Sequence, residues 1–305
     1  MQKRSLTVLG TAAQVPTASR NHVACFVRWD RHGFLFDPGE GTQRQLLYCG
    51  IKASEITKIF ITHFHGDHCL GLPGVIQRLS LQRINHPVEV FYPASGRRFY
   101  RNLLGCAAFY MAVELIERPI EAPGVVSSED GLWIEAQPLD HGTEAWGYRI
   151  KEPDSRTLLP HKLPEGICGK RIGELKQQGW IDTERGRLFL EEVSREKPGQ
   201  AFALVMDTRA CSQAVELARE TDLFVCESTY LSTEAEQATN YRHLTAAQAA
   251  EIALQAGAKK LVLLHYSQRY RWLSDFQAEA QAIHPDVTAA RDGDVFPFSQ
   301  PRRAL

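Results

Sequence analysis

The chain has 305 residues, of which 44% are hydrophobic, with a formal net charge of -1 and a pI near 6.8. Such a chain can bury a large core, and its near-neutral charge excludes a histone-like or tail-driven nucleic-acid binder, although an enzyme with a local basic patch remains open. Seven cysteines without a Cys-x-x-Cys pair argue against a disulfide-stapled secreted scaffold. No stretch reaches the roughly 18 apolar residues of a membrane span, so the sequence predicts a cytoplasmic protein with no membrane partner.

Short apolar runs alternate with amphipathic stretches along the chain. The apolar runs predict strands at 6–9, 23–27, 34–36, 58–62, 88–92, 133–136, 201–206, 223–226 and 260–264. Helical periodicity predicts helices at 41–48, 72–81, 212–219, 245–256 and 274–282. Several strands are continuously apolar, which is typical of sheets covered by helices. We therefore expect an α/β fold with helices outside a layered sheet core.

Residues 151–200 break this rhythm. They contain four prolines and six glycines, with dense charge and scattered apolar residues. We interpret them as a long, irregular, flexible arm inserted into a single domain of residues 1–305, and not as a linker between two cores. A loop without a role is the alternative.

The strongest motif directly follows the predicted strand at 58–62 and reads His63-Phe64-His65-Gly66-Asp67-His68. His63 and His65 project to the same side of an extended chain. Gly66 permits a sharp turn, after which Asp67 and His68 can swing back. Imidazole and carboxylate ligands suit zinc, and also manganese or iron. Three histidines and an aspartate within six positions make a chance surface cluster a poor alternative.

Three further donors stand where predicted strands end. His141 follows the apolar stretch that starts at residue 133, Asp207 follows the strand at 201–206, and His265 follows the strand at 260–264. Strand ends are where open α/β sheets gather ligand sites. A lone histidine of this kind is more often structural, but together with the histidine cluster these three residues favour a metal site.

This order, His-x-His-x-Asp-His followed by a distant His, an Asp and a final His, resembles the metallo-β-lactamase superfamily. Within it the chain resembles the ribonuclease Z family, on the following segments: 9–21, 36–43, 60–74, 226–230, His243 and 265–270. The resemblance implies a metallo-β-lactamase fold, which is a four-layer αβ/βα sandwich, here with a protruding arm. It also implies a zinc-dependent endoribonuclease that removes the 3′ trailer from precursor tRNA, leaving a 3′-hydroxyl on the tRNA and a 5′-phosphate on the trailer.

Two other functions remain open because a fold does not fix a substrate. One is another dinuclear hydrolase of the same fold, either a small-substrate phosphodiesterase or a thioesterase resembling glyoxalase II. The other is a non-catalytic RNA-binding protein on the same scaffold. The full set of candidate ligands argues against the latter, since buried acids and histidines without a metal are costly.

The resemblance also implies the ligand sets. One metal ion would be held by His63, His65, His141 and Asp207, and the other by Asp67, His68, His265 and the same Asp207. A carboxylate has two oxygens and can bridge two cations, whereas a neutral imidazole offers one acceptor nitrogen. The implied cofactors are two Zn²⁺ per subunit, with Mn²⁺ or Fe²⁺ as alternatives.

The catalytic roles follow from the same resemblance. Asp67 would orient the attacking water or accept its proton. Glu227 and His243 would protonate the leaving alkoxide, since a histidine held by a carboxylate stays charged more readily. The alternative for His243 is a structural residue preceding the predicted helix at 245–256.

Predicted RNA contacts are spread over three segments. Arg269 could clamp a phosphate or form a surface ion pair, and Arg20 and Asn21 in the first loop are further candidates. In the family the arm grips the tRNA, often from the partner subunit of a homodimer. Lys170 and Arg171 are therefore the predicted phosphate contacts of the arm, with a solvated charged loop as the alternative. The resemblance also implies a homodimer acting on precursor tRNA.

The sequence departs from the family pattern in three places. Cys226 stands where a histidine is usual, Pro38 replaces a cysteine, and Thr208-Arg209-Ala210 replaces a Thr-x-Pro-like turn. None of these changes removes a predicted metal ligand. Burial in a strand is the preferred interpretation of Cys226, and a metal-capable thiol is the alternative.

Overall fold

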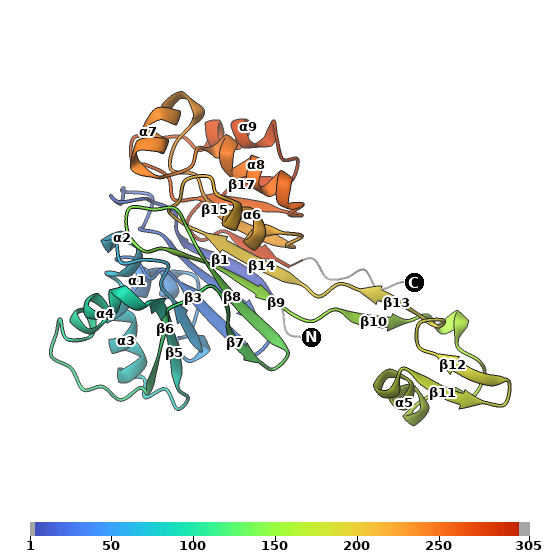
Figure 1. Ribbon diagram of the computed structural model, residues 1–305. Helices are drawn as coiled ribbons and strands as arrows, with labels where there is room; N and C mark the ends of the chain where they lie inside the picture. The colour runs from blue at the N-terminus through green and yellow to red at the C-terminus, as the bar shows by residue number, and fades with distance from the viewer. Residues whose placement is uncertain (1–3, 299–305) are drawn as a thin grey trace.

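The computed structural model describes residues 4–298, so residues 1–3 and 299–305 of the predicted single domain lie outside the described residues. Within that range two seven-stranded sheets pack face to face (Figure 1). The strands of the first sheet, in spatial order, are β18 (Val295–Pro297), β1 (Ser5–Gly10), β2 (Ala24–Trp29), β3 (His32–Phe36), β4 (Lys58–Phe60), β5 (Val88–Pro93) and β6 (Leu115–Ile120). Those of the second sheet are β17 (Val287–Ala289), β16 (Leu261–Leu264), β15 (Leu223–Glu227), β14 (Ala201–Val205), β9 (Trp146–Lys151), β8 (Leu132–Pro138) and β7 (Gly124–Glu129).

Helices cover the outer face of each sheet (Figure 1). Those on the first sheet are α1 (Thr42–Tyr48), α3 (Leu72–Leu81) and α4 (Arg97–Leu104). Those on the second sheet are α6 (Ser212–Ala218), α8 (Ala246–Ala256) and α9 (Ser274–Gln281). Two further helices, α2 (Gly66–Cys69) and α7 (Ala235–Tyr241), lie near the edge where the predicted ligands gather. Single 3₁₀ turns occur at Ala53–Glu55, Ala94–Gly96, Pro160–Lys162 and Ser232–Glu234.

Strand β14 shows why this sequence makes four layers. Phe202 and Leu204 pack between the two sheets, whereas Ala203 and Val205 pack under the helices of the second sheet. All four side chains are buried, as the period-two geometry of a strand covered on both faces requires. The four-layer αβ/βα arrangement expected from the sequence is confirmed.

The strands and helices expected from the sequence are all present, with bounds that differ by a few residues, but several elements were missed. Strand β9 shows the reason, because its run Trp-Gly-Tyr-Arg-Ile-Lys does not look apolar. Arg149 is nevertheless buried, and its Nη1 donates to the backbone oxygens of Leu217 and Arg219, 2.6 and 2.7 Å away. A guanidinium that pairs with the last carbonyls of α6 is satisfied inside the fold, which composition alone cannot indicate.

Sheet topology brings the ligand segments to one edge of the sandwich. Strands β3, β4 and β5 run parallel in the first sheet, and β14, β15 and β16 run parallel in the second. Strand β8 has the same direction as β14, because each pairs antiparallel with β9. The carboxyl ends of parallel strands share an edge, and the predicted ligands follow β4, β8, β14 and β16.

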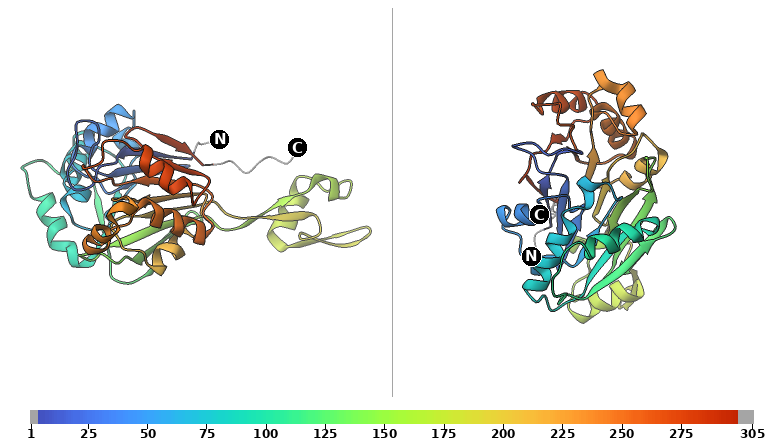
Figure 2. Two further views of the ribbon diagram at one scale, coloured as in Figure 1. Left: turned by 90° about the horizontal axis from the view of Figure 1, so that it is seen from above. Right: turned by 90° about the vertical axis from the view of Figure 1, so that its left-hand side faces the viewer.

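The segment between β9 and β14 projects from the body, as Figures 1 and 2 show, so the protruding arm is confirmed. The expectation that it is irregular is wrong. Its elements are the ribbon β10 (Ser155–Leu158) with β13 (Ser194–Lys197), the helix α5 (Lys170–Gln178), and the hairpin β11 (Trp180–Thr183) with β12 (Gly186–Phe189).

The tip of the arm has a small apolar cluster of its own, formed by Ile167, Leu175, Ile181 and Val193. Strands of four residues are too short to show a clear period in the sequence, and so they were missed. The arm leaves the body after β9, whose direction opposes that of β14. It therefore begins at the edge opposite the ligand segments.

None of the helices between residues 4 and 298 is long and apolar enough to cross a membrane.

Candidate metal centre

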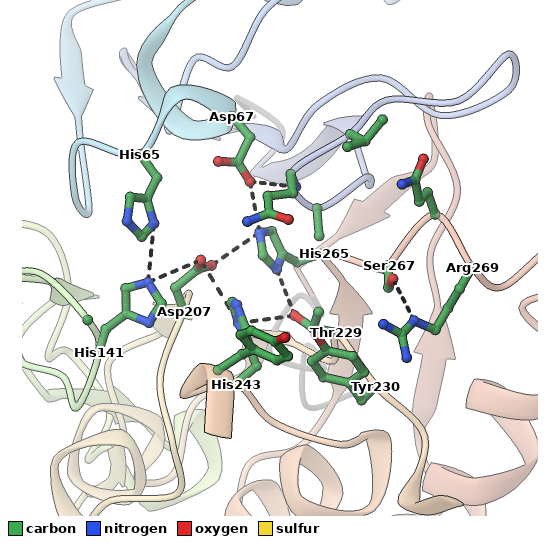
Figure 3. Close-up of a pocket in the computed structure, with 16 residues that line it drawn as sticks. His65, Asp67, His141, Asp207, Thr229, Tyr230, His243, His265, Ser267 and Arg269 are labelled. Carbon is green, nitrogen blue, oxygen red and sulfur yellow. Dashed lines mark hydrogen bonds and ion pairs between the residues drawn. The ribbon is translucent and has the colours of Figure 1, made fainter. Parts of the chain in front are cut away.

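Loops at the carboxyl ends of the strands bring the predicted ligands together, and five of them, His65, Asp67, His141, Asp207 and His265, line one cavity (Figure 3). His63 and His65 follow β4, and α2 carries the next two donors. Asp207 and His265 have φ angles of 34° and 64°, in the left-handed region. Residues other than glycine rarely adopt this conformation, and strain of this kind concentrates at functional sites. Here it turns the chain sharply where β14 and β16 end.

The first group of donor atoms consists of three histidine nitrogens and one carboxylate oxygen. Nε2 of His63 and Nε2 of His141 lie 2.9 and 3.3 Å from Nδ1 of His65. Oδ2 of Asp207 lies 3.5 Å from Nε2 of His63 and 3.7 Å from Nε2 of His141. The four side chains predicted to hold one ion thus face one point.

The second group joins α2 to the end of β16. Nε2 of His68 is 3.2 Å from Nε2 of His265, and each of these nitrogens is 3.4 Å from Oδ2 of Asp67. The other oxygen of Asp207, Oδ1, lies 3.3 Å from His68 and 3.2 Å from His265. Asp207 therefore directs one oxygen to each group, which is the arrangement of a shared ligand.

The donor set fits a pair of divalent ions on two observations. Ligands bound 2.0–2.1 Å from a tetrahedral ion are about 3.3 Å apart, and the distances above, from 2.9 to 3.7 Å, lie on both sides of that spacing. In addition, Oδ1 of Asp207 is buried and accepts no hydrogen bond within the described residues. A buried carboxylate oxygen without a partner is costly, and a cation would satisfy it.

Neighbouring side chains fix how each imidazole points. Nδ1 of His68 is 2.8 Å from Oδ2 of Asp37, and Nδ1 of His63 is 3.0 Å from Oγ1 of Thr62. Nδ1 of His265 is 2.9 Å from Oγ1 of Thr229. Such partners hold the ring so that the other nitrogen keeps its lone pair for a metal. For these three histidines the free nitrogen is Nε2.

Sequence reasoning missed Asp37 as part of this centre. It follows β3 just as the ligands follow their strands, and its φ of 45° is again left-handed. Its oxygens accept hydrogen bonds from N and Oγ1 of Thr62, at 2.7 and 2.8 Å. The strand-end position of Asp37 was the signal that could have identified it.

Asp37→Asn tests this supporting role. The amide cannot hold the His68 ring and Thr62 through two carboxylate oxygens at once, so we expect metal affinity to fall about 10- to 100-fold. Titration of the metal-free protein with Zn²⁺ in the presence of a competing chelator measures the change. Unchanged affinity would mean that the packing around His68 fixes its ring without Asp37.

Glu227 and His243 form a pair beside Asp207. Nδ1 of His243 lies 3.1 and 3.2 Å from the two oxygens of Glu227 and 4.0 Å from Oδ2 of Asp207. Glu227 is fully buried and also accepts hydrogen bonds from Oγ1 of Thr229 and the backbone N of Thr208. Burial would lower the pKa of His243, but the carboxylates of Glu227 and Asp207 outweigh burial and raise it to about 9.

The cavity that contains these groups has a volume of about 410 Å³, within the usual range of ligand pockets. Asp67 projects into it and accepts a hydrogen bond from the backbone N of Gln14, 2.7 Å away. Tyr230 and Arg269 form part of the wall that Figure 3 shows beside His243. Metal-facing donors, an ionised acid and a protonated histidine thus share one open cavity.

Comparisons with known proteins agree with this arrangement. A family model described as the metallo-beta-lactamase superfamily matches residues 20–160. The ribonuclease Z of Nocardia farcinica is 49% identical over 306 residues, covering 99% of this chain and 100% of that protein. The chain belongs to the ribonuclease Z family. The ribonuclease Z of Thermobifida fusca is 51% identical over 299 residues, covering 96% of this chain and 94% of that one.

The same family relation holds in three dimensions. The crystal structure of human tRNase Z, short form, matches with a TM-score of 0.71 at 25% identity, covering 97% of this chain and 100% of that chain. The metallo-β-lactamase fold that the sequence predicted is therefore confirmed for this ribonuclease Z family member.

The predicted RNA contacts of this family member lie in different surroundings. Arg269 lines the catalytic cavity, where its guanidinium stacks 5.0 Å from the Tyr230 ring and its Nε donates to Ser267. Lys170 and Arg171 are exposed at the start of α5, at the tip of the arm. Helix α5 lies in the arm that projects from the body in Figure 1.

Arg20 and Asn21 bind the protein's own backbone. Arg20 is buried, and its Nη2 donates to the carbonyl oxygens of Ser267 and Tyr270, 3.3 and 2.9 Å away. The amide of Asn21 donates to the carbonyl oxygens of His22 and Glu40. Both side chains hold loops together at the edge of the site, so a contact with RNA remains a prediction for them.

Cys226 is fully buried under α6 and α8, in the apolar cluster between these helices and the second sheet. Glu227, the next residue in β15, has the opposite orientation and contacts Nδ1 of His243. Within residues 4–298 Cys226 belongs to none of the groups of metal-capable side chains. Packing in a buried strand, the preferred interpretation, is what the structure shows.

Proposed function

We propose that this protein is a zinc-dependent endoribonuclease that removes the 3′ trailer from precursor tRNA, leaving a 3′-hydroxyl on the tRNA and a 5′-phosphate on the trailer. The observation that carries the proposal is the position of Asp207, with one oxygen toward each group of donors and the Glu227–His243 pair beside it. Membership of the ribonuclease Z family supports the choice of substrate.

The ligand sets are those expected from the sequence. His63, His65, His141 and Asp207 would hold one Zn²⁺, and Asp67, His68, His265 and Asp207 the other, with Mn²⁺ or Fe²⁺ as alternatives. Two such cations lower the pKa of a bound water and neutralise charge on the scissile phosphate.

Asp67 and His243 handle the two protons of the reaction. The backbone N of Gln14 holds Oδ2 of Asp67 in the cavity, where the carboxylate orients the attacking water and accepts its proton. Burial would raise the pKa of Asp67, but His68 and His265 outweigh it and lower the pKa, so the carboxylate is ionised. His243 is held through Nδ1 by Glu227, which leaves Nε2 to protonate the leaving 3′ oxygen.

The proposal includes a cytoplasmic homodimer in which the arm binds the body of the tRNA. Lys170 and Arg171 are exposed at the arm tip and are available to phosphates. The arm begins at the edge of the sandwich opposite the metal centre, which favours its action on a tRNA bound at the partner's centre.

The decisive assay uses a precursor tRNA with a 3′ trailer and the zinc-loaded protein. We expect one cut at the trailer junction, with a 3′-hydroxyl on the tRNA product. Intact RNA together with rapid hydrolysis of a small phosphodiester or a thioester would instead assign the chain to another hydrolase of this fold. Stoichiometric RNA binding without turnover in Zn²⁺, Mn²⁺ or Fe²⁺ would indicate a binding protein.

Removal of the arm tip separates binding of the tRNA from the chemistry. Residues 159–193 lie between the paired ends Leu158 and Ser194 of the ribbon, so an Asn-Gly turn can replace them. We expect KM for precursor tRNA to rise at least about tenfold, because phosphate contacts supply much of the affinity for nucleic acid. Hydrolysis of bis(4-nitrophenyl) phosphate should stay within about twofold of the full chain, since the metal centre lies elsewhere in the body.

The double variant Lys170→Ala/Arg171→Ala is a milder form of this change. Its control is Lys259→Ala, because Lys259 is an exposed lysine of the body that pairs with Asp222. Equal losses on tRNA and on the small phosphodiester would show that the arm supports the fold and is not a separate tRNA-binding element.

A further inference from the structure

A second pocket lies beside the catalytic cavity, on the other side of the segment that follows His265. Its volume is about 590 Å³, and it lies between the loop 17–20, the segment 268–273 and the turn at Arg291 and Asp292. Gln268 lines both pockets, whereas Arg269 lines the catalytic cavity and not the second pocket. The two pockets are therefore separated at this point by the segment that contains Gln268 and Arg269.

One wall of the pocket contains a buried cation with an unused donor. Arg20 is only 8% exposed, and its Nη2 is occupied by two backbone carbonyls. Its Nη1 is buried and has no hydrogen-bond partner among the described residues. An unsatisfied donor on a buried charge costs free energy, and an anionic oxygen in the pocket would supply the missing acceptor.

The opposite wall presents an aromatic ring to solvent. Trp272 is 65% exposed, and the guanidinium of Arg271 lies 5.1 Å from its ring. A ring beside an arginine offers a stacking face for a base and a positive charge for its phosphate.

The charge of the pocket points to the same class of ligand. Arg20, Arg271 and Arg291 line it, and within residues 4–298 none of their guanidinium groups is in an ion pair. The one acid among the lining residues, Asp292, accepts hydrogen bonds from Oγ1 of Thr11 and the backbone N of Asn21. Three guanidinium groups outside ion pairs thus line the pocket, together with a single carboxylate that is already engaged in hydrogen bonds.

We propose that this pocket binds one nucleotide of the single-stranded 3′ trailer, with its base on Trp272 and its phosphate at Arg20, Arg271 and Arg291. The base must be unpaired to stack, which excludes the base-paired acceptor stem and selects the trailer. The inference rests on the proposed function, because it takes the trailer as the strand that leaves the metal centre.

The test removes the ring and the base separately. Precursor tRNAs carry a single abasic nucleotide at each of the first four trailer positions, and kcat/KM is measured for wild type and Trp272→Ala. We expect Trp272→Ala to lower kcat/KM about tenfold, mainly through KM. At one trailer position the abasic substitution should lower kcat/KM of the wild type by a similar factor. The same substitution should not lower kcat/KM of Trp272→Ala any further.

Trp133→Ala is the matched control, because Trp133 lies on β8 and is also partly exposed, at 39%. It should change kcat/KM by less than about twofold. Additive losses at every trailer position would overturn the proposal, and so would coupling to an unpaired base on the tRNA side of the cut. A shift of Trp272→Ala from dimer to monomer in sedimentation would show that the surface is a protein interface and would also overturn it.

A direct binding measurement keeps this pocket distinct from the function proposed above. A fluorescein-labelled five-nucleotide single-stranded RNA, followed by fluorescence anisotropy, should bind wild type and Trp133→Ala with equal affinity, and Trp272→Ala should bind it about tenfold more weakly. If wild type fails to cut precursor tRNA but shows this difference, the proposed function is wrong and the nucleotide pocket stands. If wild type cuts precursor tRNA and Trp272→Ala binds the short RNA with the same affinity as wild type, only the nucleotide pocket is wrong.

Discussion

Asp207→Asn is expected to lower kcat/KM for precursor tRNA by at least about 10³-fold and to reduce the bound zinc below two ions per chain. The amide has the shape of the carboxylate and tolerates the left-handed backbone at this position. It keeps a single acceptor oxygen, however, and places an NH₂ where the other group of donors needs an oxygen. Metal analysis after gel filtration and steady-state kinetics measure the two effects on one sample.

The control for Asp207→Asn is Asp286→Asn, the same chemical change at an exposed carboxylate that pairs with Lys260. Surface pairs of this kind contribute little, so zinc content and activity should both be retained. Two tightly bound zinc ions in Asp207→Asn would contradict the assignment of this carboxylate as the shared ligand, whatever its activity.

His243→Ala is expected to lower precursor tRNA cleavage by about 10²- to 10⁴-fold, the usual contribution of a general acid. The leaving 3′ oxygen of RNA is a poor leaving group that needs a proton, whereas 4-nitrophenolate leaves without one. Hydrolysis of bis(4-nitrophenyl) phosphate should therefore fall less than about tenfold. The comparison of kcat on the two substrates isolates proton donation from every other role of the side chain.

Glu227→Gln should show the same substrate dependence with a smaller loss, because the imidazole remains but loses the carboxylate that keeps it protonated. His86→Ala is the control, because His86 is a half-buried histidine just before β5, at the opposite edge of the first sheet, and should leave activity on both substrates unchanged. Equal losses on both phosphodiesters, with reduced zinc, would assign His243 to the metal centre instead.

The sequence predicted the donors of the metal centre because they obey simple rules of position. His63 and His65 alternate along an extended chain, and Asp207 and His265 each end an apolar strand. Within each group the donor atoms lie within 4.8 Å of one another, and this convergence follows from strand direction, which the parallel β-α-β order makes readable. The same rule would have identified Asp37, which follows β3 as Asp207 follows β14.

The side chains that the sequence left ambiguous are those whose roles depend on burial. The sequence predicted Arg20 only as an RNA contact and did not show that its side chain also holds the backbone of Ser267 and Tyr270, since no local pattern distinguishes a buried arginine from an exposed one. Thr229 was read only as part of a motif, yet it contacts both Glu227 and His265. Contacts between separate strands decide such roles, and these appear only in three dimensions.

The direction of β9 sets the geometry of substrate capture. Its six residues span roughly 20 Å, and the arm starts where they end, away from Asp207. Within one chain, the arm and the metal centre thus lie at opposite edges of the sandwich. In the proposed homodimer, a two-fold axis would relate the two chains, and each arm would extend toward the metal centre of the partner subunit. A single tRNA would then contact the arm of one subunit and the metal centre of the other. The dimer, and not either chain alone, would set the distance from the folded body of the tRNA to its 3′ junction.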